Sequence, residues 1–276
     1  MYKRQAIRAD STCVDAAAAQ AAAERLITSD KINAIMGADC SGVTTAVLKN
    51  AAMPNGVLMI SPSATSPALS TEPDNDLFFR TAPSDARQGE VIADLLMEKG
   101  FKSAALTHTN NDYGKGLAAS IKKNYEAKGG KITITASHED GKGDYSSEVA
   151  ALAQASGDIL IVAGYLDQGG KGIIQASLDA DAFNKFFLPD GMIGDSLPKA
   201  IGPALNGSIG SVPGTDSPGN AKYAELAKAA GFESGPYGPE SYDAAALIML
   251  AMQAANSTDS NVCLLYTSPS PRDKTV

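Results

Sequence analysis

The chain has 276 residues, of which 44% are hydrophobic and 20% charged, and its formal net charge at pH 7 is −8. This length can bury a large core and suffices for one large domain or for two lobes. The negative charge and the lack of a basic cluster argue against nucleic acid or an anionic membrane surface as partner. No run of 18 apolar residues occurs, so the sequence predicts no transmembrane helix.

Helical and strand patterns alternate along most of the chain. In chain order we expect strands at 32–36, 57–60, 103–107, 131–137, 159–163, 186–188 and 208–212, with an extended segment at 77–80. We expect helices at 15–28, 43–49, 86–99, 113–128, 146–154, 169–178, 221–230 and 241–255. Such alternation is typical of βαβ units, and the predicted fold class is α/β with parallel, doubly wound (Rossmann-like) sheets.

Two proline-containing joints interrupt this alternation, RTAPSD at 80–85 and SVPGTDSPGN at 211–220. The chain also has more strands than a single sheet needs. We therefore expect the joints to be crossovers between two similar lobes. Lobe 1 would comprise residues 6–81 and 214–261, and lobe 2 would comprise residues 82–213.

The two ends of the chain lack the periodicity of a helix or a strand. The chain begins with MYKRQ and ends with CLLYTSPSPRDKTV. Both ends resemble translated adapter sequence, so we expect residues 1–5 and 262–276 to be non-native and exclude them from the fold. On this interpretation the natural termini, including any signal peptide, are missing.

Two short motifs point to catalysis but lack the residues that it requires. GADCSGVT at 37–44 has the glycine spacing of a P-loop, yet Val43 stands where the phosphate-binding lysine belongs. GDSL at 194–197 matches a signature of serine esterases, but both histidines precede it and no G-x-S-x-G elbow occurs. We interpret GDSL as a turn into a helix capped by Asp195 or Ser196. The sequence thus predicts no enzyme.

The cysteines and histidines do not form a metal-binding pattern. Cys13, Cys40 and Cys263 include no C-x-x-C pair, and His108 and His138 lie far apart, so we expect no zinc site. We expect both histidines to be solvated or to cap loops. A Cys13–Cys40 bridge is geometrically plausible because one residue precedes a helix and the other ends a strand, and two free thiols are the alternative.

Small polar residues crowd the turns after the first two strands, GADCSG after 32–36 and SPSATSP after 57–60. In an open α/β sheet, ligands bind outside the carboxyl ends of the strands. These turns would present hydroxyls and free backbone N–H groups there, without a base or a nucleophile. That set suits a small anion or a carboxylate.

Polar residues occupy the same position in five successive βα units. They are Ser41 and Thr44, then Ser63, Ala64 and Thr65, then Asn111, Asp112 and Tyr113, and finally Tyr165 and Asp190. Each alone could be an ordinary cap, turn or packing residue. Together they offer hydroxyls for a carboxylate, a lone aspartate for an ammonium group, and tyrosine walls with polar tips. A zwitterionic amino acid matches this combination.

Several segments, in order and with similar gaps, resemble one known family. They are GADCSGVTTA, GVLMISPSATSPAL, FFRTAPSDARQG, NDYGKGLA and SGPYGPESYDAA. The chain is similar over about residues 10–258 to the periplasmic substrate-binding proteins of ABC importers, of the leucine/isoleucine/valine-binding type. The resemblance implies the type I periplasmic-binding-protein fold, in which two lobes joined by three crossovers close on a ligand.

The resemblance also implies roles for single residues. Ser41 and Thr65 would bind the α-carboxylate of the ligand. The backbone of Ser63, with the side chains of Thr65 and Asp190, would bind its ammonium group, and Ala64 would line the same loop. Tyr113 and Tyr165, from lobe 2, would close over the ligand. Asp190 stands where leucine-binding members usually have glutamate.

Cys13 and Cys40 match the disulfide of lobe 1 in this family, which implies an oxidising periplasm. The family also begins with a strand, a loop and a helix that precede anything present here. We therefore expect the N-terminal strand and a C-terminal part of the fold to be missing, and lobe 1 to be incomplete.

The function implied is that of a monomeric extracytoplasmic receptor. It would bind an amino acid, of the branched-chain type or a derivative, and deliver it to the membrane permease of an ABC importer without a cofactor. Two alternatives stay open: a ligand-sensing domain of a receptor or regulator with the same fold, and an enzyme on a doubly wound sheet. The enzyme would need a base–nucleophile pair that the sequence does not offer.

Overall fold

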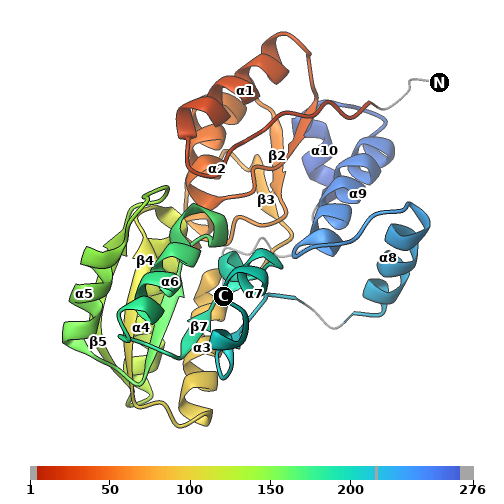
Figure 1. Ribbon diagram of the computed structural model, residues 1–276. Coiled ribbons are helices and arrows are strands. Elements are labelled where there is room, and N and C mark those ends of the chain that lie inside the picture. The colour runs from red at the N-terminus through yellow and green to blue at the C-terminus, as the bar shows by residue number, and fades with distance from the viewer. Residues whose placement is uncertain (1–4, 215–216, 268–276) are drawn as a thin grey trace. The chain divides into compact units, whose positions relative to one another are not determined.

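The computed structural model describes residues 5–214 and 217–267. The chain divides into two compact units: unit 1 is Met1–Ala82 with Asp216–Val276, and unit 2 is Pro83–Thr215. Each unit contains a parallel β-sheet with helices packed on it (Figure 1). The units thus divide at 82/83 and 215/216, and the lobe boundaries that we proposed from the sequence lie at 81/82 and 213/214.

Unit 1 has a three-stranded parallel sheet in the order β1-β2-β3. Its strands are β1 (Ala34–Met36), β2 (Leu58–Ser61) and β3 (Phe78–Arg80), and its helices are α1 (Ala16–Thr28), α2 (Ser41–Val47), α8 (Pro218–Ala229), α9 (Gly238–Ala255) and α10 (Ser260–Thr267). Within the described residues, β1 pairs only with β2 and forms an edge of the sheet.

The strands of unit 1 bury both faces, as parallel strands do. Because successive side chains alternate in direction, Met59 packs with the apolar residues of α1 and α2, while Ile60 packs with Ala244 and Ile248 of α9. All four residues of β2 are buried. The carboxyl end of this strand is thereby fixed between two layers of helix.

Unit 2 has a five-stranded parallel sheet in the order β5-β4-β6-β7-β8. Its strands are β4 (Ser103–Thr109), β5 (Lys131–His138), β6 (Ile159–Ala163), β7 (Phe186–Leu188) and β8 (Ile209–Gly210). Its helices are α3 (Asp85–Glu98), α4 (Asp112–Ala127), α5 (Ser146–Ala155), α6 (Lys171–Asp179) and α7 (Ser196–Ile201). The α/β class with two parallel sheets is the one predicted from the sequence.

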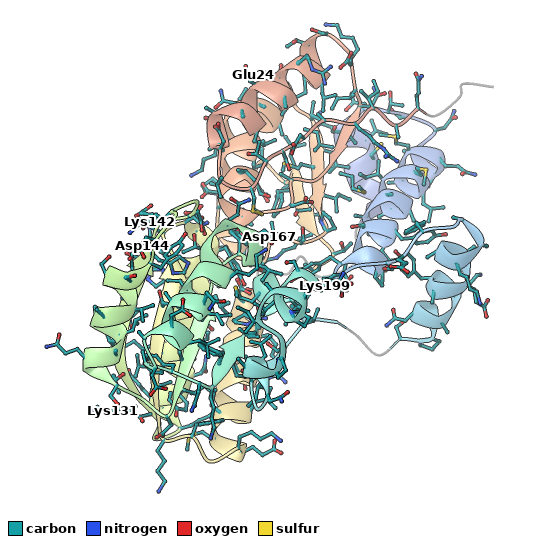
Figure 2. The ribbon with its side chains drawn as sticks, in the orientation of Figure 1. Glu24, Lys131, Lys142, Asp144, Asp167 and Lys199 are labelled. Carbon is teal, nitrogen blue, oxygen red and sulfur yellow. A yellow bond between two sulfur atoms is a disulfide. The ribbon has the colours of Figure 1, made fainter. Side chains whose placement is uncertain are left out.

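The helices of unit 2 cover opposite faces of its sheet. Helices α3 and α4 pack with Leu106 and Ile161 on one face, and α5, α6 and α7 pack with Leu160 and Val162 on the other. Every residue of β6 is buried. Exposed charged side chains such as Lys131, Asp144 and Lys199 lie at the surface of the unit (Figure 2).

Helices α2 and α10 of unit 1 are among the elements that differ from the sequence-based expectation. Helix α2 begins at Ser41 rather than at 43, because Cys40 already adopts the extended conformation of an N-cap residue. Helix α10 lies where we expected no regular element. It is anchored because Ser260 Oγ accepts a hydrogen bond from the Leu58 backbone N–H at 3.0 Å and because Cys263 is buried.

The remainder of the expected non-native ends, residues 1–4 and 268–276, lies outside the described residues, and their non-native origin stays a prediction. None of the helices in the described part of the chain combines the length and the hydropathy that crossing a lipid bilayer requires.

Candidate functional site

Buried hydroxyls join the two loops that follow β1 and β2 in unit 1. Ser61, the last residue of β2, donates its hydroxyl hydrogen to the Ala38 carbonyl at 2.6 Å and accepts the Ala64 N–H at 3.0 Å. Ser41 Oγ accepts the Ser66 N–H at 3.1 Å. The two loops therefore hold a fixed geometry at the carboxyl edge of the sheet.

This arrangement corrects the expectation that the loops offer free backbone N–H groups. The N–H groups of Ala64 and Ser66 already bond to Ser61 and Ser41, because a buried backbone donor needs a partner. A serine hydroxyl carries one hydrogen and two lone pairs, so Ser41 retains a hydrogen that it can donate to a carboxylate.

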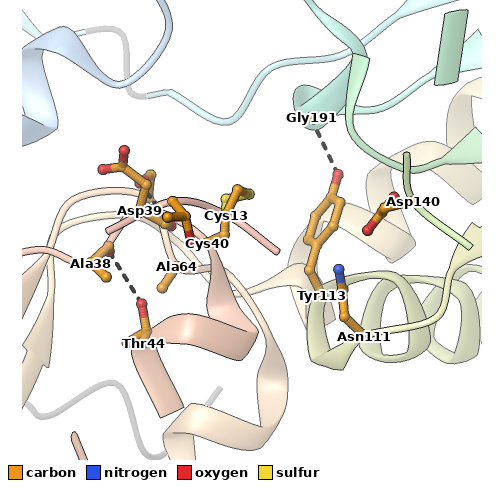
Figure 3. Close-up of a disulfide and its surroundings, with 12 residues drawn as sticks. Cys13, Ala38, Asp39, Cys40, Thr44, Ala64, Asn111, Tyr113, Asp140 and Gly191 are labelled. Atoms are coloured by element: carbon orange, nitrogen blue, oxygen red, sulfur yellow. Dashed lines mark hydrogen bonds between the residues drawn. A yellow bond between two sulfur atoms is a disulfide. The ribbon is translucent and has the colours of Figure 1, made fainter. Parts of the chain in front are cut away.

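Of the other predicted residues of unit 1, Ser63, Ala64 and Thr65 lie in the loop after β2, and Thr44 lies on α2. Ser63 is half-buried and donates its hydroxyl hydrogen to the Asp39 carbonyl at 3.0 Å, which adds a third link between the loops. Ala64 is fully buried, and Thr65 is 1% exposed. Thr44, on α2, donates to the Ala38 carbonyl at 3.2 Å (Figure 3).

Arg80 supports this loop from β3, and we did not assign it a role from the sequence. Its Nη1 donates to the carbonyls of Ala64 and Ser66 at 3.1 and 2.9 Å, and its Nη2 bonds to Ser70 Oγ. The guanidinium thus orients two peptide groups and places a positive charge beside the loop proposed for the carboxylate. This role could not be predicted from the sequence, because an arginine at the end of a strand does not by itself indicate a contact with another loop.

Cys13 and Cys40 form a disulfide with a Cα–Cα distance of 5.3 Å, as the resemblance implied (Figure 3). The bond connects the residues before α1 to the N-cap position of α2. It therefore fixes the loop that carries Ser41.

In unit 2 the predicted residues Tyr113, Tyr165 and Asp190 come together at the carboxyl edge of the sheet. The Tyr113 hydroxyl donates to Asp190 Oδ1 at 2.9 Å. It also accepts the Gly191 N–H at 3.2 Å (Figure 3). Both Tyr113 and Asp190 are buried. A Cβ atom on Gly191 would lie 2.5 Å from the Gly164 carbonyl oxygen, so this turn requires glycine.

The rings of Tyr113 and Tyr165 stack with their centroids 4.9 Å apart and an interplanar angle of 18°. Burial raises the pKa of the Tyr165 phenol well above its ordinary value, and the carboxylates of Asp190 and Asp140 raise it further. The phenol therefore stays protonated at physiological pH and can donate a hydrogen bond.

His138 corrects the expectation of a solvated or loop-capping histidine. It ends β5, is 1% exposed, and its Nδ1 lies 2.8 Å from Thr107 Oγ1. Burial lowers its pKa to about 4, with the neighbouring His108 adding to the effect. The alternation of β5 turns this side chain inward, which a histidine near a strand end does not reveal by itself.

The GDSL segment begins α7 at Ser196, with Asp195 at the N-cap position, in agreement with the turn-into-helix interpretation. The Asp195 side chain makes no capping hydrogen bond, so the proposed capping role is wrong for this residue. Ser196 Oγ instead donates to Asp167 Oδ1 at 3.0 Å.

Comparison with known proteins identifies binding proteins as relatives and structural neighbours. The chain is 34% identical over 235 residues to the Leu/Ile/Val-binding protein homolog 1 of Brucella melitensis, covering 83% of this chain and 62% of that protein. The leucine binding protein LivK of Thermotoga maritima has a similar fold, with a TM-score of 0.81 at 22% identity over 92% of this chain and 73% of that one.

A solute binding protein of an ABC transporter from R. palustris, solved with 4-hydroxybenzoate, is similar at a TM-score of 0.76 and 19% identity, covering 91% of this chain and 70% of that one. The two solved structures share the type I periplasmic-binding-protein fold. The chain spans about 62% of the length of the Brucella relative. The family described as periplasmic binding protein matches residues 9–264, which is most of the sequence. The chain therefore belongs to the periplasmic binding protein family.

Proposed function

We propose that this protein is an extracytoplasmic solute receptor that binds an α-amino acid, of the branched-chain type or a derivative, for uptake by an ABC importer. Membership of the periplasmic binding protein family supports a binding role without catalysis. The name of the Brucella relative and that of the Thermotoga protein support an aliphatic amino acid as the class of ligand.

The observation that carries the proposal is the hydrogen bond between Tyr113 and Asp190. It holds a buried carboxylate in one orientation at the carboxyl edge of the unit 2 sheet. An ionised carboxylate forms short, strong hydrogen bonds to charged donors, so a ligand ammonium group is a suitable additional partner for Asp190.

The roles that we propose for the other residues follow their chemistry. Ser41 and Thr65 bind the α-carboxylate as hydroxyl donors, and the backbone of Ser63 with the Thr65 side chain binds the ammonium group together with Asp190. Ala64 lines the loop. The stacked rings of Tyr113 and Tyr165 cover the aliphatic part of the ligand.

We further propose that the two units close on the ligand at the joints between them. The protein would act as a monomer in the periplasm and deliver its ligand to membrane permease subunits, with no nucleic acid as partner. The Cys13–Cys40 disulfide supports an oxidising compartment.

The proposal is tested by isothermal titration of leucine, isoleucine and valine into the wild-type chain and an Asp190→Asn variant. Loss of the charge opposite a buried ammonium group should weaken binding of the best ligand by about 30-fold or more, since breaking one side of such a pair costs about 2–5 kcal/mol. Asp195→Asn is the matched control, because the Asp195 side chain is 91% exposed, and it should bind like wild type. Equal affinity of wild type and Asp190→Asn would contradict the ammonium site.

A further inference from the structure

Several side chains of unit 2 carry buried polar atoms without a hydrogen-bond partner among the described residues. They include the Oδ1 atom of Asp140, the hydroxyl of Tyr165, Nε2 of His138, and both polar atoms of the Gln88 carboxamide, a residue that is 7% exposed. Buried polar atoms in native proteins nearly always have a partner. Such atoms therefore mark places where a ligand group or an ordered water binds.

The sheet topology brings these side chains to one edge. In the register of the sheet, Thr109 of β4 lies opposite His138 of β5, and His108 lies opposite Ala163 of β6. Asp140 comes two residues after His138, and Tyr165 comes two residues after Ala163. The two residues therefore follow the strands on either side of β4. Gln88 lies near the start of α3, which runs back along the sheet and so begins at this same carboxyl edge.

Among the described residues, the Asp140 carboxylate has a hydrogen-bond partner at Oδ2 and none at Oδ1. Its Oδ2 accepts the hydroxyl hydrogen of Thr109 at 2.6 Å, and Thr109 Oγ1 in turn accepts from Asn111 Nδ2 at 3.2 Å. Thr109 is fully buried, and its one hydroxyl hydrogen is directed to Asp140 because an ionised carboxylate can only accept. Asn111, Tyr113 and Asp140 are drawn together at this edge in Figure 3.

The loop that carries Asp140 is anchored as well. The buried Tyr145 hydroxyl donates to the Glu139 carbonyl at 3.1 Å and accepts the Lys142 N–H at 3.1 Å. Burial raises the pKa of the Asp140 carboxyl, and the neighbouring Glu139 raises it further against the hydrogen bond from Thr109. A carboxylate kept in such an environment gains strongly from an added donor.

A carboxylate oxygen can only accept hydrogen bonds, so the complement of Asp140 Oδ1 is an N–H or O–H donor. The protonated Tyr165 phenol can accept the same donor group or donate to an oxygen beside it. An aliphatic side chain at this position would leave Asp140 Oδ1 buried without a partner.

We propose that Asp140 and Tyr165 form a polar subsite for the side chain of the ligand, and that this side chain ends in an N–H donor group. The inference rests on the proposed function, in which Asp190 and Ser41 bind the main-chain groups of an amino acid. Within the class of the proposed function, the inference favours a derivative over the branched-chain type itself. The ligand is then an amino acid of about the size of leucine that carries a terminal carboxamide or amine in place of methyl groups.

Three ligands of nearly equal shape test this subsite by isothermal titration into the full chain. Leucine is apolar at the branch, asparagine carries a donor there, and aspartate carries only acceptors. Asparagine should bind at least about tenfold tighter than leucine, and aspartate should bind more weakly than both, since one hydrogen bond to a charged group is worth tenfold or more. Lysine and glutamine extend the test to longer donor groups.

An Asp140→Asn variant should reduce the preference for asparagine over leucine to less than about twofold. Glu139→Gln is the matched control, because it removes one negative charge from the adjacent, exposed position and should keep the wild-type preference. Circular dichroism melts of both variants establish that they are folded.

Several results would overturn the inference. Leucine binding as tightly as asparagine would contradict the donor subsite while leaving the proposed function standing. An unchanged preference in Asp140→Asn, or an equal loss in Glu139→Gln, would contradict the role of the Asp140 oxygen. A folded wild-type chain that binds no amino acid would contradict both this inference and the proposed function.

Discussion

Single polar side chains at strand ends determine the chemistry of each unit. Ser61 and Ser41 use their hydroxyls to complete the backbone hydrogen bonds of their loops, whereas Asp190 is oriented by Tyr113. Loss of such a buried hydroxyl leaves donors and acceptors unsatisfied, at a cost of about 1–3 kcal/mol for each group. These residues therefore fix the geometry of the loops proposed to bind the ligand.

A single residue, His138, also predicts that the stability of the fold depends on pH. The pKa of His138 is about 4 in the folded protein, below the ordinary value of 6.5, because burial disfavours the imidazolium. The unfolded chain therefore binds a proton more readily than the native state. The stabilisation is complete above pH 6.5 and is lost as the pH falls toward 4, in total about 3 kcal/mol.

A His138→Gln variant should accordingly lose less stability than wild type between pH 7 and pH 4. Urea unfolding of both proteins across this range measures the difference in their free energies of unfolding. Parallel stability curves for wild type and His138→Gln would contradict the assignment.

At the scale of elements, the disulfide and the helix starts hold the site loops. The Cys13–Cys40 bond closes a loop with a sequence separation of 27 residues, which contains α1 and β1. In the chain-entropy model such a loop stabilises the folded state by about 3–4 kcal/mol.

A Cys13→Ser/Cys40→Ser variant should therefore have a free energy of unfolding about 3 kcal/mol lower than that of the wild type, as measured by urea titration. Dithiothreitol should destabilise the wild type by a similar amount and leave the variant unchanged. A reductant effect of equal size on both proteins would contradict the role of this bond, since Cys263 is the remaining cysteine.

Elements with a continuous apolar run were predictable from the sequence. Strands β6 and β7 have the expected bounds because ILIVA and FFL are bordered by polar residues and turns. Helix α6 begins at Lys171, two residues later than expected, because a π-helical turn at Leu166–Gly170 with non-helical backbone angles at Gly169 precedes it. The two glycines of this turn, Gly169 and Gly170, lie close to Tyr145 and Met192. Contacts of this kind join residues far apart in the chain, and no local pattern carries them.

At the scale of the whole molecule, the position that we propose for the site was predicted from topology alone. Parallel strands predict that polar residues after each strand share one edge, and Tyr113, Tyr165 and Asp190 do so in unit 2. The inward direction of His138, the leftover oxygen of Asp140 and the support from Arg80 depend on register and on hydrogen bonds across the fold. These features became visible only in the structure.

The central claim is that the chain recognises both charged groups of an amino acid. The R. palustris neighbour was solved with a carboxylate that has no ammonium group, so this point distinguishes two kinds of ligand within one fold. The most direct test is isothermal titration of the full chain with the twenty amino acids, followed by the analogues of the best ligand that lack either the amino or the carboxylate group. We predict one-to-one binding of an amino acid and a loss of at least about 100-fold for each analogue, as expected when a buried charged group loses its partner. Equal binding of the analogue without the amino group, or no binding of any amino acid by the folded chain, would contradict the account.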